Sequence, residues 1–198
     1  MSKGRLFVIS GPSGTGKGTI CKELLKRKPL QLSVSMTTRQ PRTGEENGVH
    51  YYFVTKEEFQ EKIANGGLLE HAEVYGNYYG TPEASIDELL NDGRDVMLEI
   101  EPQGALQVKK LFPEAVLMFL VPPSMAELKN RLITRGRESE AEIAERIENA
   151  KWELEQADKY TVLIENDNLN ECVKCVLEYI ETKRKERKKI NGLINEIV

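Results

Sequence analysis

The feature that most constrains this chain is a glycine-rich loop that stands between an apolar run and an amphipathic helical pattern. Residues 6–9 are all apolar, and Ile20 and Leu24 follow the loop at the spacing of one helix face. A G-x-x-x-x-G-K pattern binds phosphate when it joins a strand to a helix, because its backbone N–H groups and the helix N-terminus face the anion. We therefore expect a polyphosphate site made by Gly11, Pro12, Ser13, Gly14, Thr15, Gly16, Lys17, Gly18 and Thr19.

Within this loop, two side chains have the chemistry of a nucleotide site. Lys17 supplies a mobile positive charge for the outer phosphates, and the Thr19 hydroxyl would lie near them and near any Mg²⁺. Gly18 stands where a Walker motif has Ser or Thr, so that the hydroxyl comes one residue late. We interpret this as a variant of the loop; the alternative is a glycine turn that binds nothing.

Composition limits the partners of the chain. Its 198 residues suit one core domain with insertions, and 28 basic against 32 acidic residues give no basic surface of the size that nucleic acid requires. The sequence has no apolar run of membrane length and no N-terminal signal core. We expect a cytoplasmic protein that binds neither nucleic acid nor membrane. Cys172 and Cys175 have zinc spacing without a second ligand pair, which favours ordinary helix residues.

Strand-like and helix-like patterns alternate along the chain, which predicts an α/β fold: a P-loop NTPase-type parallel sheet with helices on both faces. The alternation is interrupted at residues 35–81, which predict a small mixed α/β insert. We expect one strand at residues 31–36, a turn at 76–80 and a helix from 81. Three capping boxes, at 55–58, 124–127 and 139–142, predict helix starts. The expected parts are a core of 1–34, 82–124 and 151–198, the insert 35–81, and a helical lid at 125–150.

The insert carries residues suited to a second phosphate group. Arg39 and Arg42 lie in one polar loop, and Tyr51 and Tyr79 come from segments that can converge on it. Guanidinium groups and phenol hydroxyls together hold phosphate strongly. The alternative is two solvated arginines and two half-buried tyrosines.

Ser35, Glu70 and Thr81 indicate which base accompanies that phosphate. A carboxylate accepts from two adjacent donors, which guanine presents as N1–H and its 2-amino group and adenine does not. A buried Glu70 would therefore select guanine, and the two hydroxyls could donate to guanine O6 or N7. Glu70 could equally be a strand residue that faces water.

Two glutamates, Glu99 and Glu101, follow a predicted parallel strand at its C-terminal end, where α/β sheets bind ligands. Such carboxylates hold the water ligands of Mg²⁺ or bond to a ribose or base. Since alternate strand positions point to opposite faces, we expect one of the two to face a given ligand. A charged strand end without function is the alternative.

Arginines gather between two predicted helices, as Arg131, Arg135, Arg137 and Arg146. On a mobile lid, such cations would stabilise the charge of a phosphoryl group in transfer and exclude water. A charged turn between helices is the alternative.

Over about residues 4–180, the chain resembles the guanylate kinase family. The segments that carry the resemblance are GPSGTGKGT at 11–19, SVSMTTRQPRTGEENGVHYYF at 33–53, LLEHAEVYGNYYGT at 68–81, LEIEPQGA at 98–105 and TRGRES at 134–139. The resemblance implies that ATP and GMP, or dGMP, react with Mg²⁺ to give ADP and GDP for purine nucleotide metabolism.

The same resemblance implies roles for individual residues. Lys17, Arg135 and Arg146 would serve phosphoryl transfer, and Thr19 and Glu99 would lie near Mg²⁺, through water. The implied guanine-reading residues are Ser35, Glu70 and Thr81, and the implied phosphate ligands are Arg39, Arg42, Tyr51 and Tyr79. We also expect Gly80, Glu99 and Glu101 at the GMP site. The chain departs from the family where we expect Asp in the strand-end pair and find Glu99 and Glu101, each longer by one methylene.

We expect direct in-line transfer of the ATP γ-phosphate to a GMP phosphate oxygen, without a covalent protein intermediate. Two other functions fit parts of the sequence. A guanylate-kinase-like binding module would have abandoned catalysis, although such modules lose the phosphate loop that is intact here. A kinase for another nucleoside monophosphate would share the loop and leave Glu70 without a role.

Overall fold

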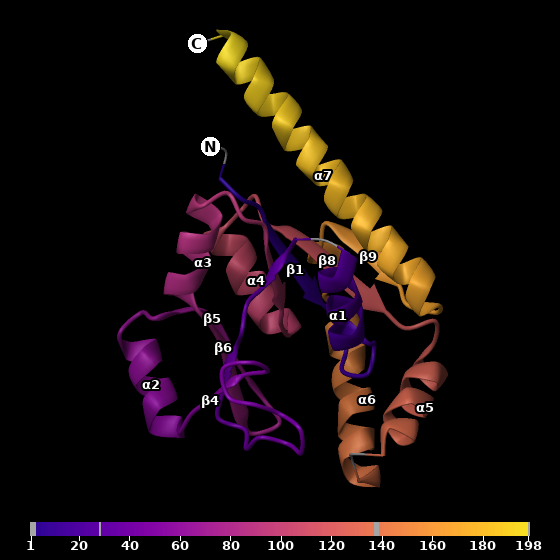
Figure 1. Ribbon diagram of the computed structural model, residues 1–198. Helices are drawn as coiled ribbons and strands as arrows, with labels where there is room; N and C mark the ends of the chain where they lie inside the picture. Colours follow the sequence, from indigo (N-terminus) through magenta and orange to yellow (C-terminus); the bar gives the residue numbers. More distant parts are fainter. Residues whose placement is uncertain (1–2, 28, 137–138, 198) are drawn as a thin grey trace.

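The computed structural model describes residues 3–27, 29–136 and 139–197, and it contains two sheets of different kinds (Figure 1). The larger sheet has five strands in the order β2-β7-β1-β8-β9, and all of its pairs are parallel. Its strands are β1 (Leu6–Ser10), β2 (Gln31–Leu32), β7 (Val96–Glu99), β8 (Val116–Val121) and β9 (Val162–Glu165). The predicted α/β class with a parallel sheet is confirmed.

Helices cover both faces of this sheet because its strands are apolar on both sides. Phe7 and Ile9 of β1 pack with α1 (Lys17–Arg27) and α7 (Leu169–Ile197). Leu6 and Val8 point to the other face, where α3 (Glu83–Asn91) and α4 (Pro102–Leu111) cover them. Helix α7 runs past the body of the core toward the C-terminus (Figure 1).

The two cysteines of α7 differ in environment. Cys172 is buried against the core sheet, whereas Cys175, one turn further along, is exposed. Within the described part of the chain, no three His, Cys, Asp or Glu side chains are grouped to hold a metal ion. Across the same residues, no helix has the length and hydropathy to cross a membrane.

The smaller sheet lies in the interrupting segment. Its strands are β3 (Met36–Thr37), β4 (Tyr52–Phe53), β5 (Leu68–Val74) and β6 (Asn77–Pro82), in the order β4-β3-β6-β5. Helix α2 (Lys56–Ala64) begins at the predicted capping box of Thr55 and Glu58, which is confirmed. Its Phe59 is buried and stacks on Tyr78 of β6, with 5.5 Å between ring centroids.

Two local predictions for this segment are wrong. The single strand expected at 31–36 is two short strands in different sheets: β2 pairs with β7 of the core, and β3 pairs with β6. The turn expected at 76–80 is the start of β6, because only Tyr75 and Gly76 turn the chain between β5 and β6. Helix α3 accordingly begins at Glu83, two residues later than expected. A local apolar pattern does not specify which sheet will accept a strand.

The remaining two helices form an arm beside the core. They are α5 (Met125–Arg135) and α6 (Glu140–Glu155), and a 3₁₀ turn, η1 (Ala157–Lys159), follows. The capping box of Ser139 and Glu142 is confirmed. At α5 only half of the predicted capping box forms: the Ser124 side chain accepts a hydrogen bond from the Glu127 backbone N–H. The Glu127 carboxylate instead accepts a hydrogen bond from Arg131. Arg137, which we expected in the arginine cluster, lies outside the described residues.

Two side-chain hydrogen bonds join the smaller sheet to the core. The Gln107 amide of α4 donates to the His71 carbonyl at 2.6 Å, and the His71 N–H donates to the Gln107 side-chain oxygen at 3.2 Å. This contact fixes β5 against α4, next to Glu70.

Candidate active site

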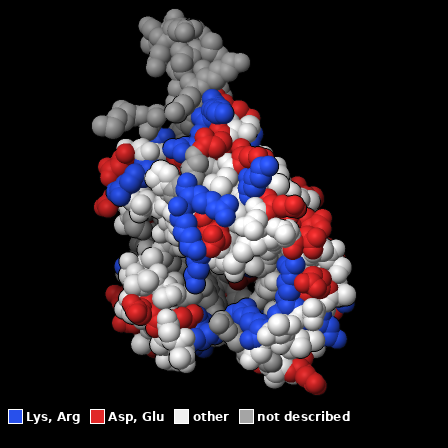
Figure 2. All heavy atoms as spheres, turned by 45° about the vertical axis from the view of Figure 1, so that its right-hand side comes forward, with Lys and Arg blue, Asp and Glu red and all other residues white. Residues whose placement is uncertain are grey.

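A cleft of about 560 Å³ lies where the glycine-rich loop, the smaller sheet and the α5–α6 arm meet. Figure 2 shows a hollow in this face with lysine and arginine side chains beside it. Of the predicted site residues, the cleft is lined by Pro12, Ser13, Gly14, Gly16, Lys17, Gly18, Thr19, Arg39, Arg42, Tyr51, Tyr79, Glu99, Glu101, Arg135 and Arg146. The structure thus brings together residues from the glycine-rich loop, the smaller sheet and its loops, the end of β7 and the α5–α6 arm.

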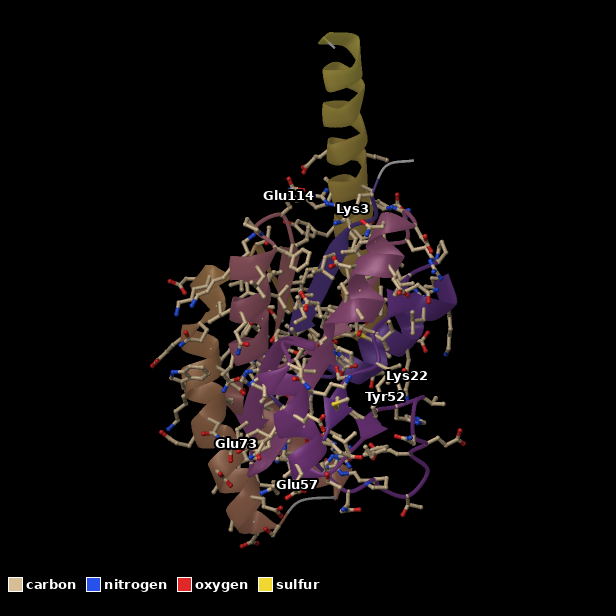
Figure 3. The ribbon with its side chains drawn as sticks, turned by 90° about the vertical axis from the view of Figure 1, so that its left-hand side faces the viewer. Lys3, Lys22, Tyr52, Glu57, Glu73 and Glu114 are labelled. Carbon is tan, nitrogen blue, oxygen red and sulfur yellow. The ribbon has the colours of Figure 1, made fainter. Side chains whose placement is uncertain are left out.

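A smaller cavity of about 30 Å³ adjoins this cleft and shares Tyr51, Tyr79, Glu99 and Glu101 with it. It adds Ser35, Glu70 and Gly80. The three predicted residues that line neither of these two cavities, Gly11, Thr15 and Thr81, are buried. A third cavity, which includes Lys3 and Glu114, lies at the end of the molecule opposite to Glu57 and is remote from the site (Figure 3).

Glycine conformation shapes the loop. Gly14 and Gly16 have φ values of +94° and +92°, which side chains disfavour. The loop is held from below by Asn166, whose side-chain amide donates to the Thr15 carbonyl at 2.7 Å. Helix α1 starts at Lys17, so the N-terminus of the helix faces the cleft directly after the loop.

Lys17 is folded back onto its own loop. Its ammonium donates to the Gly11 carbonyl and to that of Pro12 at 3.4 Å, and it lies 3.6 Å from a Glu101 carboxylate oxygen. The side chain is 10% exposed. The cation is therefore held at the bottom of the cleft by groups that an anion could replace.

Glu70 is buried, with 3% of its surface exposed, so it is not a strand residue that faces water. A β-bulge between Leu68 and Glu70 explains this, because it lets both Leu69 and Glu70 point inward. The Thr81 hydroxyl donates to a Glu70 carboxylate oxygen at 2.6 Å. Burial raises the pKa of Glu70 to about 7, against the lowering effect of the Thr81 hydrogen bond.

Gly104 of α4, which we did not predict as a site residue, makes room for this carboxylate. A Cβ atom at Gly104 would lie 1.9 Å from Glu70 Oε2 and 2.8 Å from its Cδ. With Glu70 in this position only glycine fits, because a side chain at 104 would displace the carboxylate. In the sequence, only the glycine of the LEIEPQGA segment pointed to this position, and the sequence does not reveal that Glu70 is the residue it contacts.

Arg39 and Arg42 lie in a loop ordered by Glu45, another residue that sequence reasoning missed. Two Arg39 nitrogens each lie 3.0 Å from a Glu45 oxygen, and the Arg42 backbone N–H donates to the same carboxylate at 2.7 Å. The Arg39 guanidinium also lies over the Tyr51 ring, 5.5 Å from its centroid. Tyr51 and Tyr79 meet edge to face at 6.1 Å. The four predicted phosphate ligands thus converge on one end of the cleft.

The expectation that only one of Glu99 and Glu101 faces the site is wrong, since both line both cavities. Strand β7 ends at Glu99, and Glu101 is already the N-cap of α4, so strand alternation does not apply between them. Burial raises the pKa of Glu99, and Lys17 partly offsets this. A Cβ atom at Gly18 would lie 3.2 Å from Glu99 Oε1, so the glycine of the G-K-G-T variant lies close to this carboxylate.

The arm contributes arginines from two helices. One Arg146 nitrogen donates to the Ser13 hydroxyl of the loop at 2.6 Å, and the Arg131 guanidinium donates to the Asn166 carbonyl at 2.9 Å. Arg131 and Arg135 line the cleft with Arg146. The arm therefore presents positive charge to the same space that the glycine-rich loop faces.

Comparisons with known proteins agree with this geometry. A family model described as guanylate kinase matches residues 3–183. The guanylate kinase of Clostridium tetani is 50% identical over 184 residues, which cover 93% of this chain and 88% of that protein. The guanylate kinase of Bacillus subtilis is 52% identical over 169 residues, 84% of this chain and 83% of that protein. A crystal structure of guanylate kinase from Anaplasma phagocytophilum superposes with a TM-score of 0.78 at 33% identity, covering 92% of this chain and 87% of that one.

Proposed function

The chain belongs to the guanylate kinase family, and from that premise we propose how its residues carry out the reaction. The family relation makes the chain a nucleoside monophosphate kinase, an ATP:GMP phosphotransferase. The assignment of individual residues to steps of the reaction rests on the geometry of the cleft.

We propose that GMP binds in the smaller cavity and at the adjoining end of the cleft. The ionised Glu70 carboxylate would accept from guanine N1–H and the 2-amino group, while the hydroxyls of Ser35 and Thr81 bond to other edges of the base. Arg39, Arg42, Tyr51 and Tyr79 would hold the phosphate, and Gly80 would lie beside the base in the smaller cavity. In support, these residues come from one sheet and its loops, and all but Thr81, whose hydroxyl donates to Glu70, line the smaller cavity or the cleft.

ATP would place its phosphates on the glycine-rich loop, residues 11–19. Lys17 then exchanges the Gly11 and Pro12 carbonyls for phosphate oxygens, which are stronger partners for an ammonium ion. Arg135 and Arg146 would neutralise charge on the transferred phosphoryl group. Because the GMP phosphate is already ionised, no general base is needed, and catalysis consists of positioning and charge neutralisation.

Mg²⁺ fits the oxygen donors at the base of this cleft. Thr19 offers a hydroxyl, and Glu99 and Glu101 offer carboxylates, which suits a cation that uses one or two protein ligands and completes its shell with phosphates and water. When bound with ATP, Mg²⁺ would neutralise charge on the phosphates. Glu99 would act through water.

We propose that the chain works as three parts: a core of residues 1–34, 82–124 and 151–198, a GMP-binding insert of 35–81 and a lid of 125–150. The two sheets support the division between core and insert, since strands on either side of residues 33–35 pair in different sheets. The substrates ATP and GMP, or dGMP, are nucleotides of the cytoplasm, where we place the reaction.

The observation that carries guanine selection is the buried Glu70 carboxylate beside Thr81. It is tested by measuring ADP formation with ATP and Mg²⁺ while GMP, dGMP, AMP, CMP and UMP are offered separately. We expect ADP with GMP or dGMP alone, because none of the other bases presents two adjacent donors to the buried carboxylate. Turnover with AMP at a comparable rate would refute the role of Glu70. GMP binding without turnover would favour a binding module.

A further inference from the structure

One residue at the edge of the cleft has a backbone conformation that its side chain disfavours. Tyr75 is the first residue of the two-residue turn between β5 and β6, with φ = +50°, and Gly76 follows with φ = +71°. Turns of this geometry favour Asn or Gly at both positions, and a bulky residue there is strained. Among the described non-glycine residues, Tyr75 alone has a positive φ. Its side chain must therefore form contacts that offset this cost.

The Tyr75 ring contacts the lid. Its centroid lies 4.4 Å from the guanidinium carbon of Arg146, within the range of a cation–π interaction. Burial raises the pKa of Tyr75, while the side chains of Asn149 and Arg146, both on α6, lower it. The ring is half-buried and lines the cleft.

Arg146 thus touches the other two parts of the molecule at once. Its guanidinium lies over Tyr75 of the insert and donates to Ser13 of the phosphate loop at 2.6 Å. The β5–β6 hairpin, whose turn contains Tyr75, also carries Glu70, Tyr79 and Thr81. Glu73, two residues before the turn, is labelled in Figure 3 and shows where the hairpin lies. One β-hairpin therefore connects the proposed GMP contacts to the proposed transfer arginine.

We propose that Tyr75 is a positioning residue for Arg146: its ring holds the guanidinium over the phosphate loop, so that placement of the GMP-binding hairpin also places the arginine. The inference rests on the proposed role of Arg146 in phosphoryl transfer. Tyr75 makes no contact with the reacting atoms and acts through Arg146. Its loss should slow transfer without weakening the contacts that hold GMP.

The test compares Tyr75→Gly with Tyr75→Phe. Glycine relieves the strained turn, so the variant keeps or gains thermal stability while it loses the ring. We expect kcat to fall about tenfold, the size of a partly desolvated cation–π contact, with the KM for GMP within about twofold of the unaltered protein. Tyr75→Phe keeps the ring and should recover most of the lost turnover. Trp152→Ala removes a 44% exposed aromatic from the same helix α6 and is the matched control.

A double-mutant cycle with Arg146→Ala separates positioning from an independent effect. If Tyr75 acts through Arg146, adding Tyr75→Gly to Arg146→Ala changes kcat by less than about twofold. Wild-type kcat in Tyr75→Gly, multiplicative losses in the double variant, or a Tyr75→Phe variant as slow as Tyr75→Gly would each overturn the inference. Normal turnover in Arg146→Ala would instead refute the proposed role of Arg146, on which the inference rests.

Discussion

The smaller cavity around Glu70 and the cleft around Lys17, which we call the base-reading end and the transfer end of the site, differ in size and in how their charged groups are held. Around Glu70 the space is small, about 30 Å³, and the carboxylate is buried, paired with Thr81 and packed against Gly104. Around Lys17 the cleft is wide, about 560 Å³, and its charges are held by carbonyls and hydroxyls of the protein. To select a base, a site needs a buried polar group that costs free energy when the wrong base leaves it without hydrogen-bond partners. Phosphoryl transfer instead needs charged groups that exchange their partners readily.

The largest effect is expected at the transfer end. Lys17→Met should lower kcat by about 10³, as for the loss of one charged or hydrogen-bonding group that stabilises a transition state. GMP binding, measured directly by calorimetry, should change little because Lys17 lies outside the smaller cavity. Lys26→Met on the exposed side of α1 is the control. Loss of GMP binding in Lys17→Met, or turnover close to that of the unaltered protein, would contradict this separation of base selection from transfer.

An intermediate effect is expected at the base-reading end. Gly104→Ala places a methyl group where the Glu70 carboxylate lies and should lower kcat/KM for GMP by about 10², since displacements of about 1 Å have effects of this size. The KM for ATP should stay the same. Gly67→Ala is the matched control because its Cβ would meet only Lys62, at 3.3 Å and beyond. Equal losses for both substrates would show that the substitution disturbs the core and not the GMP site alone.

The smallest expected effect is a pH dependence of the KM for GMP, which arises from Glu70 at the base-reading end. With its pKa raised to about 7 by burial, Glu70 is largely protonated at pH 6 and largely ionised at pH 8. Guanine donates to the ionised form, so the KM for GMP should fall about tenfold between these values. Glu70→Gln keeps the shape, should weaken GMP selectivity and should remove this dependence. The same pH profile in Glu70→Gln would assign the titration to GMP or to another residue.

Much of the fold followed from periodicity and turn chemistry. The apolar strands of the core, the helix after the glycine-rich loop and the capping boxes at Thr55 and Ser139 needed only local information. The strand expected at 31–36 was wrong because a two-residue strand carries almost no pattern, and its partners, β7 and β6, lie far away in the sequence.

Site residues with distinctive chemistry could be named in advance, but their environments could not. Glu70 was recognisable as a candidate, whereas its burial depends on a bulge at Leu69 and on the approach of Gly104 from another helix. Tyr75 gave no signal as a cleft residue, because an aromatic before a glycine has no special meaning until the turn places it over Arg146.

The sequence by itself determined the phosphate loop, the α/β class and the family, because these depend on residue types at fixed spacing along one strand, loop and helix. The tertiary structure alone decided that Glu99 and Glu101 both face the cleft, that Gly104 seats Glu70 and that Tyr75 contacts Arg146. The physical reason is the same in each case. Burial and close contact depend on side chains that are distant in sequence, and local propensity contains no information about which of them will meet.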